Sequence, residues 1–225
     1  MPPFVIAPTE RVTLVGRTGS GKTYAARSLL AKRHRLIVID PKDELLEPAW
    51  NLEDYTDRLA RDLLAGKPAR IRVTAPVGEL PDWEVSYRLA YMAAGPTQPV
   101  AVYTDEVYGV VNPGSKPGPW FTAVYTRGRT RYCSAWAATQ RPTWVPRFLF
   151  SEADWLLCFL LSELQDRKRM AEVMGPLVEM APPTRYGFWL KNVYWKAPIL
   201  AKQIKVVKAT RQMVKASDAA REAVG

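Results

Sequence analysis

A glycine-rich segment contains the residue types that bind phosphate groups. Residues 16–23 read Gly-Arg-Thr-Gly-Ser-Gly-Lys-Thr, after an apolar run and before an amphipathic stretch. Glycines allow backbone N–H groups to turn inward around an anion, and the positive end of a following helix adds to that field. We expect Lys22 to reach the β- and γ-phosphates of ATP and Thr23 to bind Mg²⁺. A glycine-rich turn is the structural alternative. The expected nucleotide-binding residues are Gly16, Thr18, Gly19, Ser20, Gly21, Lys22, Thr23 and Tyr24.

Two adjacent carboxylates follow a second apolar run, residues 100–104. Ligands of α/β sheets bind at the carboxyl ends of the strands, so Asp105 and Glu106 are expected beside the phosphate loop. Asp105 would hold Mg²⁺, directly or through water, and Glu106 would polarise the attacking water. A surface ion pair is the alternative role for Glu106. The pair predicts an ATPase that hydrolyses ATP to ADP and phosphate.

A third polar signal, Ala-Ala-Thr-Gln-Arg-Pro at residues 137–142, ends another expected strand. Gln140 stands where a side chain could contact the γ-phosphate. In this order, the three motifs resemble those of the FtsK/HerA superfamily of DNA-pumping ATPases. The segment 36–42, Leu-Ile-Val-Ile-Asp-Pro-Lys, adds to the resemblance, which spans residues 11–142.

The resemblance implies further roles. Gln140 matches the polar sensor of that superfamily, and an arginine about ten residues earlier acts on the nucleotide of the neighbouring subunit. The matching residue is Arg129, although Arg127 and Arg131 flank it and the assignment stays open among the three. Contact with DNA phosphates is the alternative role for these arginines. The expected catalytic residues are Lys22, Glu106, Gln140 and Arg129.

We expect none of the extra domains of larger superfamily members within these 225 residues, and in this the sequence resembles the genome-packaging ATPases of membrane-containing icosahedral viruses. That resemblance implies a double-stranded DNA translocase that works as a homo-oligomeric, hexameric ring. It also implies partners at a capsid vertex or a membrane-associated portal, and a location in the host cytoplasm or at the virion vertex. Other DNA pumps of the superfamily, cellular or conjugative, are the alternative.

Composition agrees with an intracellular globular protein. The 225 residues are 48% hydrophobic and 24% charged, and no apolar run approaches the roughly 20 residues that span a membrane. No signal peptide is apparent. Two cysteines in apolar runs are expected to be buried thiols, and two cysteines with a single histidine argue against a structural zinc site.

Alternating apolar runs and helical periods predict an α/β fold, a RecA/FtsK-like P-loop core whose mostly parallel sheet is flanked by helices. Expected strands are 11–15, 36–40, 70–74, 100–104, 132–139 and 154–161. Expected helices are 22–33, 52–64, 82–94, 120–127 and 163–174.

The C-terminal part is expected to be an appendage. A hairpin is predicted from 185–190 and 193–196, followed by a helix over 199–224. We therefore divide the chain into an ATPase domain, 1–190, and a basic extension, 191–225. The extension has a net charge of +6, out of +10 for the whole chain, and so suggests a polyanionic partner. A solvated helix face is the alternative.

Two other function classes also use a phosphate loop. A small-substrate kinase needs a mobile lid, and the proline-rich segment 112–119 is short for that purpose. An assembly protein that binds ATP without hydrolysing it would not need Glu106 as a base.

Overall fold

A computed structural model describes residues 5–45, 48–75, 82–111 and 114–202. The strands are β1 Val12–Val15, β2 Arg35–Asp40, β3 Glu53–Asp54, β4 Ala69–Thr74, β5 Val100–Thr104, β6 Cys133–Thr139, β7 Trp155–Cys158, β8 Phe188–Asn192 and β9 Ile199–Ala201. Within the described residues they form one nine-stranded sheet, ordered β3-β4-β2-β5-β6-β1-β7-β8-β9. Pairing is parallel from β3 to β7, whereas β8 and β9 are antiparallel additions.

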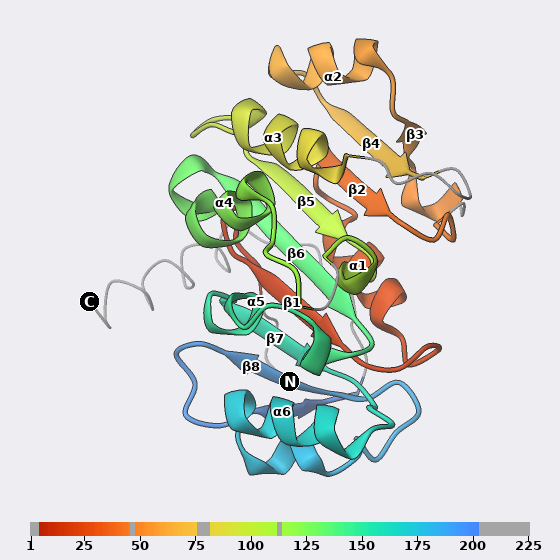
Figure 1. Ribbon diagram of the computed structural model, residues 1–225, viewed down its shortest axis with the longest axis vertical. Coiled ribbons are helices and arrows are strands. Elements are labelled where there is room, and N and C mark those ends of the chain that lie inside the picture. The colour runs from red at the N-terminus through yellow and green to blue at the C-terminus, as the bar shows by residue number, and fades with distance from the viewer. Residues whose placement is uncertain (1–4, 46–47, 76–81, 112–113, 203–225) are drawn as a thin grey trace.

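Helices cover both faces of this sheet. They are α1 Lys22–Leu30, α2 Asp57–Leu64, α3 Trp83–Ala93, α4 Pro119–Arg127, α5 Phe148–Ser151 and α6 Leu164–Met174. Short 3-10 turns are η1 Pro48–Trp50, η2 Val107–Gly109, η3 Gly128–Arg131, η4 Pro142–Trp144 and η5 Pro176–Glu179. Helices α2 to α6 contribute to one apolar core along one face of the sheet, whereas α1 and η1 contribute to the core on the other (Figure 1).

The central strands are buried on both faces, which explains why they read as continuous apolar runs. All six residues of β2 and all seven of β6 are buried. Strands of this kind are typical of parallel sheets with helices on both sides. The predicted α/β class with a mostly parallel sheet is therefore confirmed.

Some expected boundaries were wrong. The helix expected from residue 52 begins at Asp57, because the Thr56 hydroxyl accepts a hydrogen bond from the Leu59 N–H at 3.3 Å and caps it. Glu53 and Asp54 instead pair with β4 at the edge of the sheet. The strand expected over 154–161 is shorter and ends at Cys158.

The appendage also differs from expectation. A hairpin is present, but its second strand is β9, Ile199–Ala201, rather than residues 193–196. Residues 199–201, expected to begin a helix, therefore form a strand. From residue 203 on, that expected helix, with most of the basic residues of the extension, lies outside the described residues, and the division at residue 190 stays a prediction. No helix in the described ranges has the length and apolarity that a membrane span requires.

Candidate functional site

The phosphate loop connects the end of β1 to the start of α1. Its glycines adopt backbone angles that other residues rarely adopt, with φ of 154° at Gly16 and 106° at Gly21. A Cβ atom on Gly16 would lie 2.6 Å from Phe159 Cβ, so the residue is also required by close packing. Backbone hydrogen bonds fix the loop, since Gly16 N donates to Thr139 O at 3.1 Å and Arg17 N to Leu160 O at 2.8 Å.

Lys22 lies in the first turn of α1 and folds back over this loop. Its Nζ atom donates to Gly16 O at 2.6 Å and to Arg17 O at 3.2 Å. Burial lowers the pKa of Lys22, and the negative charges of Glu106 and Asp105 oppose that shift. The ammonium group therefore contacts the phosphate loop and interacts electrostatically with two carboxylates.

Asp105 and Glu106 follow β5 and are both buried. Asp105 accepts a hydrogen bond from the Tyr103 hydroxyl. Burial raises the pKa of Asp105, whereas the Tyr103 hydrogen bond and the charge of Lys22 act in the opposite direction. Asp105 is thus a buried acid that interacts with the charge of Lys22.

Glu106 is turned toward the neighbouring strand by an unusual backbone angle, φ 61°. Its Oε1 atom accepts hydrogen bonds from Thr139 Oγ1 and from Gln140 N, both at 3.0 Å. Its Oε2 atom lies 3.9 Å from Lys42 Nζ. A strained backbone that persists at a buried carboxylate is typical of functional sites.

Gln140 connects the carboxylate to the phosphate loop. Its backbone N–H contacts Glu106, and its side-chain Oε1 accepts a 2.7 Å hydrogen bond from Thr18 Oγ1. The structure therefore brings together three motifs that are spread over more than a hundred residues of the sequence.

These groups surround one pocket of about 230 Å³. It is lined by the expected residues Thr18, Gly19, Gly21, Lys22, Thr23, Tyr24, Asp105, Glu106 and Gln140. Of the other expected residues, Gly16 supplies the carbonyl that Lys22 contacts, and Ser20 Oγ is buried with no hydrogen-bond partner within the described residues. Oxygen atoms of Thr23 and Asp105 share the pocket, which suits Mg²⁺, an ion that prefers oxygen ligands and takes the remainder from water and phosphate.

Asp40, at the end of β2, holds the turn that contributes Lys42 and Glu44 to this pocket. It is fully buried and accepts hydrogen bonds from Leu45 N at 2.8 Å and Glu44 N at 3.2 Å. Burial raises the pKa of Asp40, which these backbone hydrogen bonds and Arg72 partly offset. Asp40 thereby fixes the turn that carries Lys42 to Glu106.

The arginine cluster lies at the opposite end of the strands from the pocket. Arg127 ends α4, and Arg129 and Arg131 lie in η3, directly before β6. Because a strand rises about 3.3 Å per residue, β6 separates them from Gln140 by roughly 20 Å. None of the three can therefore reach the pocket of its own chain. This distance does not distinguish among them, and the choice of Arg129 stays a prediction.

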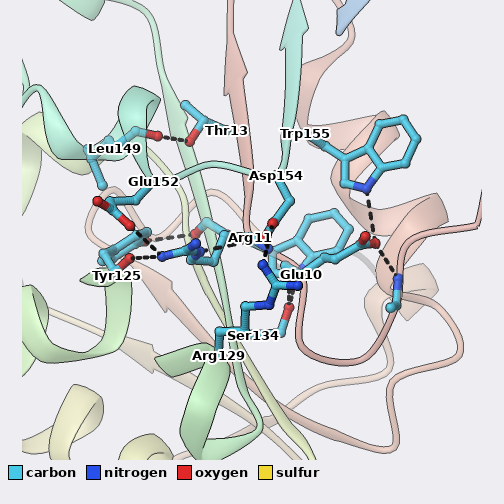
Figure 2. A network of polar contacts seen from close by, with 12 residues as sticks. Glu10, Arg11, Thr13, Tyr125, Arg129, Ser134, Leu149, Glu152, Asp154 and Trp155 are labelled. Atoms are coloured by element: carbon cyan, nitrogen blue, oxygen red, sulfur yellow. Dashed lines mark hydrogen bonds and ion pairs between the residues drawn. The ribbon is translucent and has the colours of Figure 1, made fainter. Parts of the chain in front are cut away.

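Arg129 is held by a polar network at this end of the strands. Figure 2 shows Arg129 and Arg11 converging on Asp154, with Arg129 Nη1 3.4 Å from Asp154 Oδ1. Asp154 Oδ2 accepts a hydrogen bond from Arg11 N at 2.8 Å, and Arg11 Nη1 pairs with Glu152 at 2.9 Å. The Arg129 side chain is nevertheless 47% exposed, so it is both oriented and accessible.

Comparison with known proteins identifies the family. No family model matches the chain. Over 163 residues, 71% of this chain and 67% of the relative, it is 31% identical to the DNA packaging ATPase P9 of Enterobacteria phage PRD1. The chain belongs to the DNA-packaging ATPase family. The expected resemblance to viral genome-packaging ATPases is thereby confirmed.

Solved structures share the fold. The genome packaging NTPase B204 from Sulfolobus turreted icosahedral virus 2, in complex with ATP-gammaS, matches with a TM-score of 0.72 at 18% identity, over 89% of this chain and all of B204. The pCW3 conjugation coupling protein TcpA matches at 0.60, with 10% identity, over 94% of this chain and 66% of TcpA. VirB4 of Thermoanaerobacter pseudethanolicus matches at 0.57, with 12% identity, over 93% and 94%.

Sequence reasoning gave no role in the site to three residues that line the pocket of this packaging ATPase: Lys42, Glu44 and Tyr186. Lys42 was noted only as part of the superfamily resemblance. The available signal was a lysine two residues after the Asp that ends an apolar run. Tyr186 lies far from every motif and reaches the pocket through the antiparallel pairing of β8, which local sequence patterns do not reveal.

Proposed function

We propose that this chain is the ATP-driven motor that moves double-stranded DNA into a viral capsid. The observation that carries the proposal is the convergence of Lys22, Glu106 and Gln140 on one pocket in a member of the DNA-packaging ATPase family. The pocket provides a site for phosphates, a buried carboxylate and a polar residue that connects the two.

The arrangement supports hydrolysis of ATP to ADP and phosphate. Loop N–H groups and Lys22 would bind the β- and γ-phosphates, with Thr23 and Asp105 holding Mg²⁺. The bound Mg²⁺ would offset the charge that develops on the phosphate oxygens. Glu106 would accept the proton of the attacking water. Asp105 would be engaged with the metal, so Glu106 is the carboxylate beside the loop that remains available for this role.

Gln140 makes hydrolysis detectable by the rest of the chain. Its side chain contacts Thr18 of the phosphate loop and its backbone contacts Glu106. Loss of the γ-phosphate would change the field at Thr18 and thereby the position of Gln140. Because Gln140 follows β6 directly, such a change passes into the central sheet.

The location of the arginines supports a ring. A guanidinium that stabilises transition-state charge is worth about 10³–10⁵ in rate. Arg129 lies too far from its own pocket to supply that effect, and its exposed side chain at the opposite end of the strands suits delivery to a neighbour in a head-to-tail assembly. A hexamer is the ring we propose.

Charge supports the choice of DNA as the cargo. The chain has a net charge of +10, and lysines and arginines that contact phosphates bind DNA without reading its sequence. A partner at a capsid vertex or a membrane-associated portal, and action in the host cytoplasm or at the virion vertex, complete the proposal.

Mixing two inactive variants tests the ring and the motor together. Arg129→Ala keeps an intact pocket, and Glu106→Gln keeps an intact arginine, so mixed rings contain some complete sites. We expect DNA-stimulated ATPase activity to return on mixing and to rise with protein concentration. Arg127→Ala and Arg131→Ala, each mixed with Glu106→Gln, are the matched controls that show which arginine acts. Turnover that is independent of both DNA and concentration would refute the proposal.

A further inference from the structure

The nucleotide pocket has a wall that the phosphate chemistry does not use. Two tyrosines line it, Tyr24 in the first turn of α1 and Tyr186 in the segment before β8. They are 53% and 50% exposed, which places them among the more exposed large apolar side chains of the described residues. Half-exposed aromatic rings beside a phosphate-binding loop suit the base of a nucleotide better than they suit water.

The topology explains how Tyr186 reaches this position. The parallel strands end at the pocket edge, and β8 runs antiparallel to β7, with Trp189 opposite Cys158. An antiparallel strand begins where its parallel neighbours end, so the residues directly before β8 lie beside the phosphate loop. A Cβ atom on Gly21 would lie 3.5 Å from Tyr186 Cδ1, which shows how close the contact is.

Packing and a backbone hydrogen bond hold the segment that carries Tyr186. Phe188 packs on Phe159 with ring centroids 4.8 Å apart, and Gly187 N donates to Thr184 O at 3.0 Å to close the turn that presents Tyr186. The same Phe159 lies against Gly16 of the phosphate loop. The segment that carries Tyr186 is therefore held against the phosphate loop.

Each tyrosine has a guanidinium over its ring. Arg27 Cζ lies 5.3 Å from the Tyr24 centroid, and Arg185 Cζ lies 5.2 Å from the Tyr186 centroid. A cation on one face of a ring holds the ring in place and leaves the other face for a planar group.

We propose that Tyr186, with Tyr24, forms a stacking site for the purine base of the nucleotide, so that the antiparallel appendage supplies a wall of the ATP pocket. This rests on the proposed function of the phosphate loop. Stacking recognises the aromatic face of a base rather than its hydrogen-bonding edge. The site therefore binds ATP and GTP alike and binds the smaller pyrimidine nucleotides more weakly.

Calorimetric titration of the full chain with ADP and with inorganic tripolyphosphate separates base from phosphate recognition. We expect Tyr186→Ala to weaken ADP binding about tenfold to a hundredfold, the usual range for loss of one stacking ring, and to leave tripolyphosphate binding unchanged. Tyr186→Phe should retain ADP binding, because the ring and not the hydroxyl carries the interaction. Tyr194→Ala, which removes a 59% exposed tyrosine outside the pocket, is the matched control.

Three outcomes overturn the inference. ADP affinity of Tyr186→Ala within about twofold of wild type excludes stacking, and an equal loss of ADP and tripolyphosphate shows a defect in the loop instead. Tighter binding of CDP than of ADP by the wild type also contradicts it. Should Tyr186→Ala fail to fold, Tyr24→Ala on the exposed surface of α1 is read by the same criteria. A chain that shows the Tyr186 dependence but no DNA-stimulated hydrolysis would refute the motor and leave the base site standing.

Discussion

Replacing Glu106 by glutamine removes a charge while leaving a pattern of contacts almost intact. The amide oxygen of the variant can still accept the hydrogen bonds that Thr139 Oγ1 and Gln140 N donate at 3.0 Å. The ion pair with Lys42 is long, 3.9 Å, and Lys42 is partly exposed, so its loss should change the free energy of unfolding by about 1 kcal/mol or less. What disappears is the ability to accept a proton from water, together with the negative charge that raises the pKa of Lys22.

The expected size of the effect follows from this separation. A positioned general base contributes about 10²–10⁴ to a rate, which corresponds to about 3–5 kcal/mol in the activation barrier. We therefore expect kcat to fall by that factor, while ADP affinity and the melting temperature stay close to those of the wild type.

Single-turnover hydrolysis, ADP titration and thermal unfolding together check this expectation. Glu179→Gln, the same substitution on an exposed glutamate in η5, is the matched control and should behave as the wild type. A fall in kcat of less than about tenfold would show that Glu106 is not the base. A parallel loss of ADP affinity and of stability would show that its role is structural.

Three further substitutions test other parts of the site. Gly16→Ala should destabilise the chain by about 1–3 kcal/mol, because the new Cβ would lie 2.6 Å from Phe159 Cβ; thermal unfolding measures this, and Gly95→Ala, which has open space, should change little. Asp105→Asn should raise the melting temperature at neutral pH and abolish Mg²⁺-dependent hydrolysis, because burial raises the pKa of Asp105 and the ionised carboxylate costs stability. That gain should shrink as the pH falls through the raised pKa toward the ordinary 3.8, where the wild-type carboxyl is protonated as well; a gain that grows on acidification would contradict the reasoning. Asp154→Asn should lower the free energy of unfolding by roughly 1.5–3 kcal/mol, because the ionic hydrogen bonds of Asp154 are lost. It should also lower kcat of the assembled protein without changing ADP affinity. An unchanged kcat would show that Asp154 does not orient Arg129.

The sequence was informative wherever chemistry follows directly from a buried strand. The phosphate loop after β1, the two carboxylates after β5 and Gln140 after β6 could be placed at one edge of the sheet because parallel strands end together. The central strands were recognisable since burial on both faces makes them apolar throughout.

The remaining features depend on contacts that are distant in sequence. Residues 53–54 read as part of a helical period, yet pairing with β4 and the cap at Thr56 decide their structure. The position of β9, and with it the presentation of Tyr186, depends on antiparallel pairing between segments whose local patterns allow several registers. Lys42 was visible as a motif residue, but its proximity to Glu106 requires the turn that Asp40 holds.

Strand β6 joins two ends with different partners. At one end Gln140 contacts the phosphate loop of its own chain, and at the other η3 presents Arg129 at the far end of the strands. All seven residues of β6 are buried between β5 and β1, so the strand cannot bend or stretch independently of the sheet. In a ring, it would act as a rigid element about 20 Å long. A displacement at one nucleotide site would then be transmitted to the next site without a flexible linker, and this single strand would determine the order of hydrolysis around the ring.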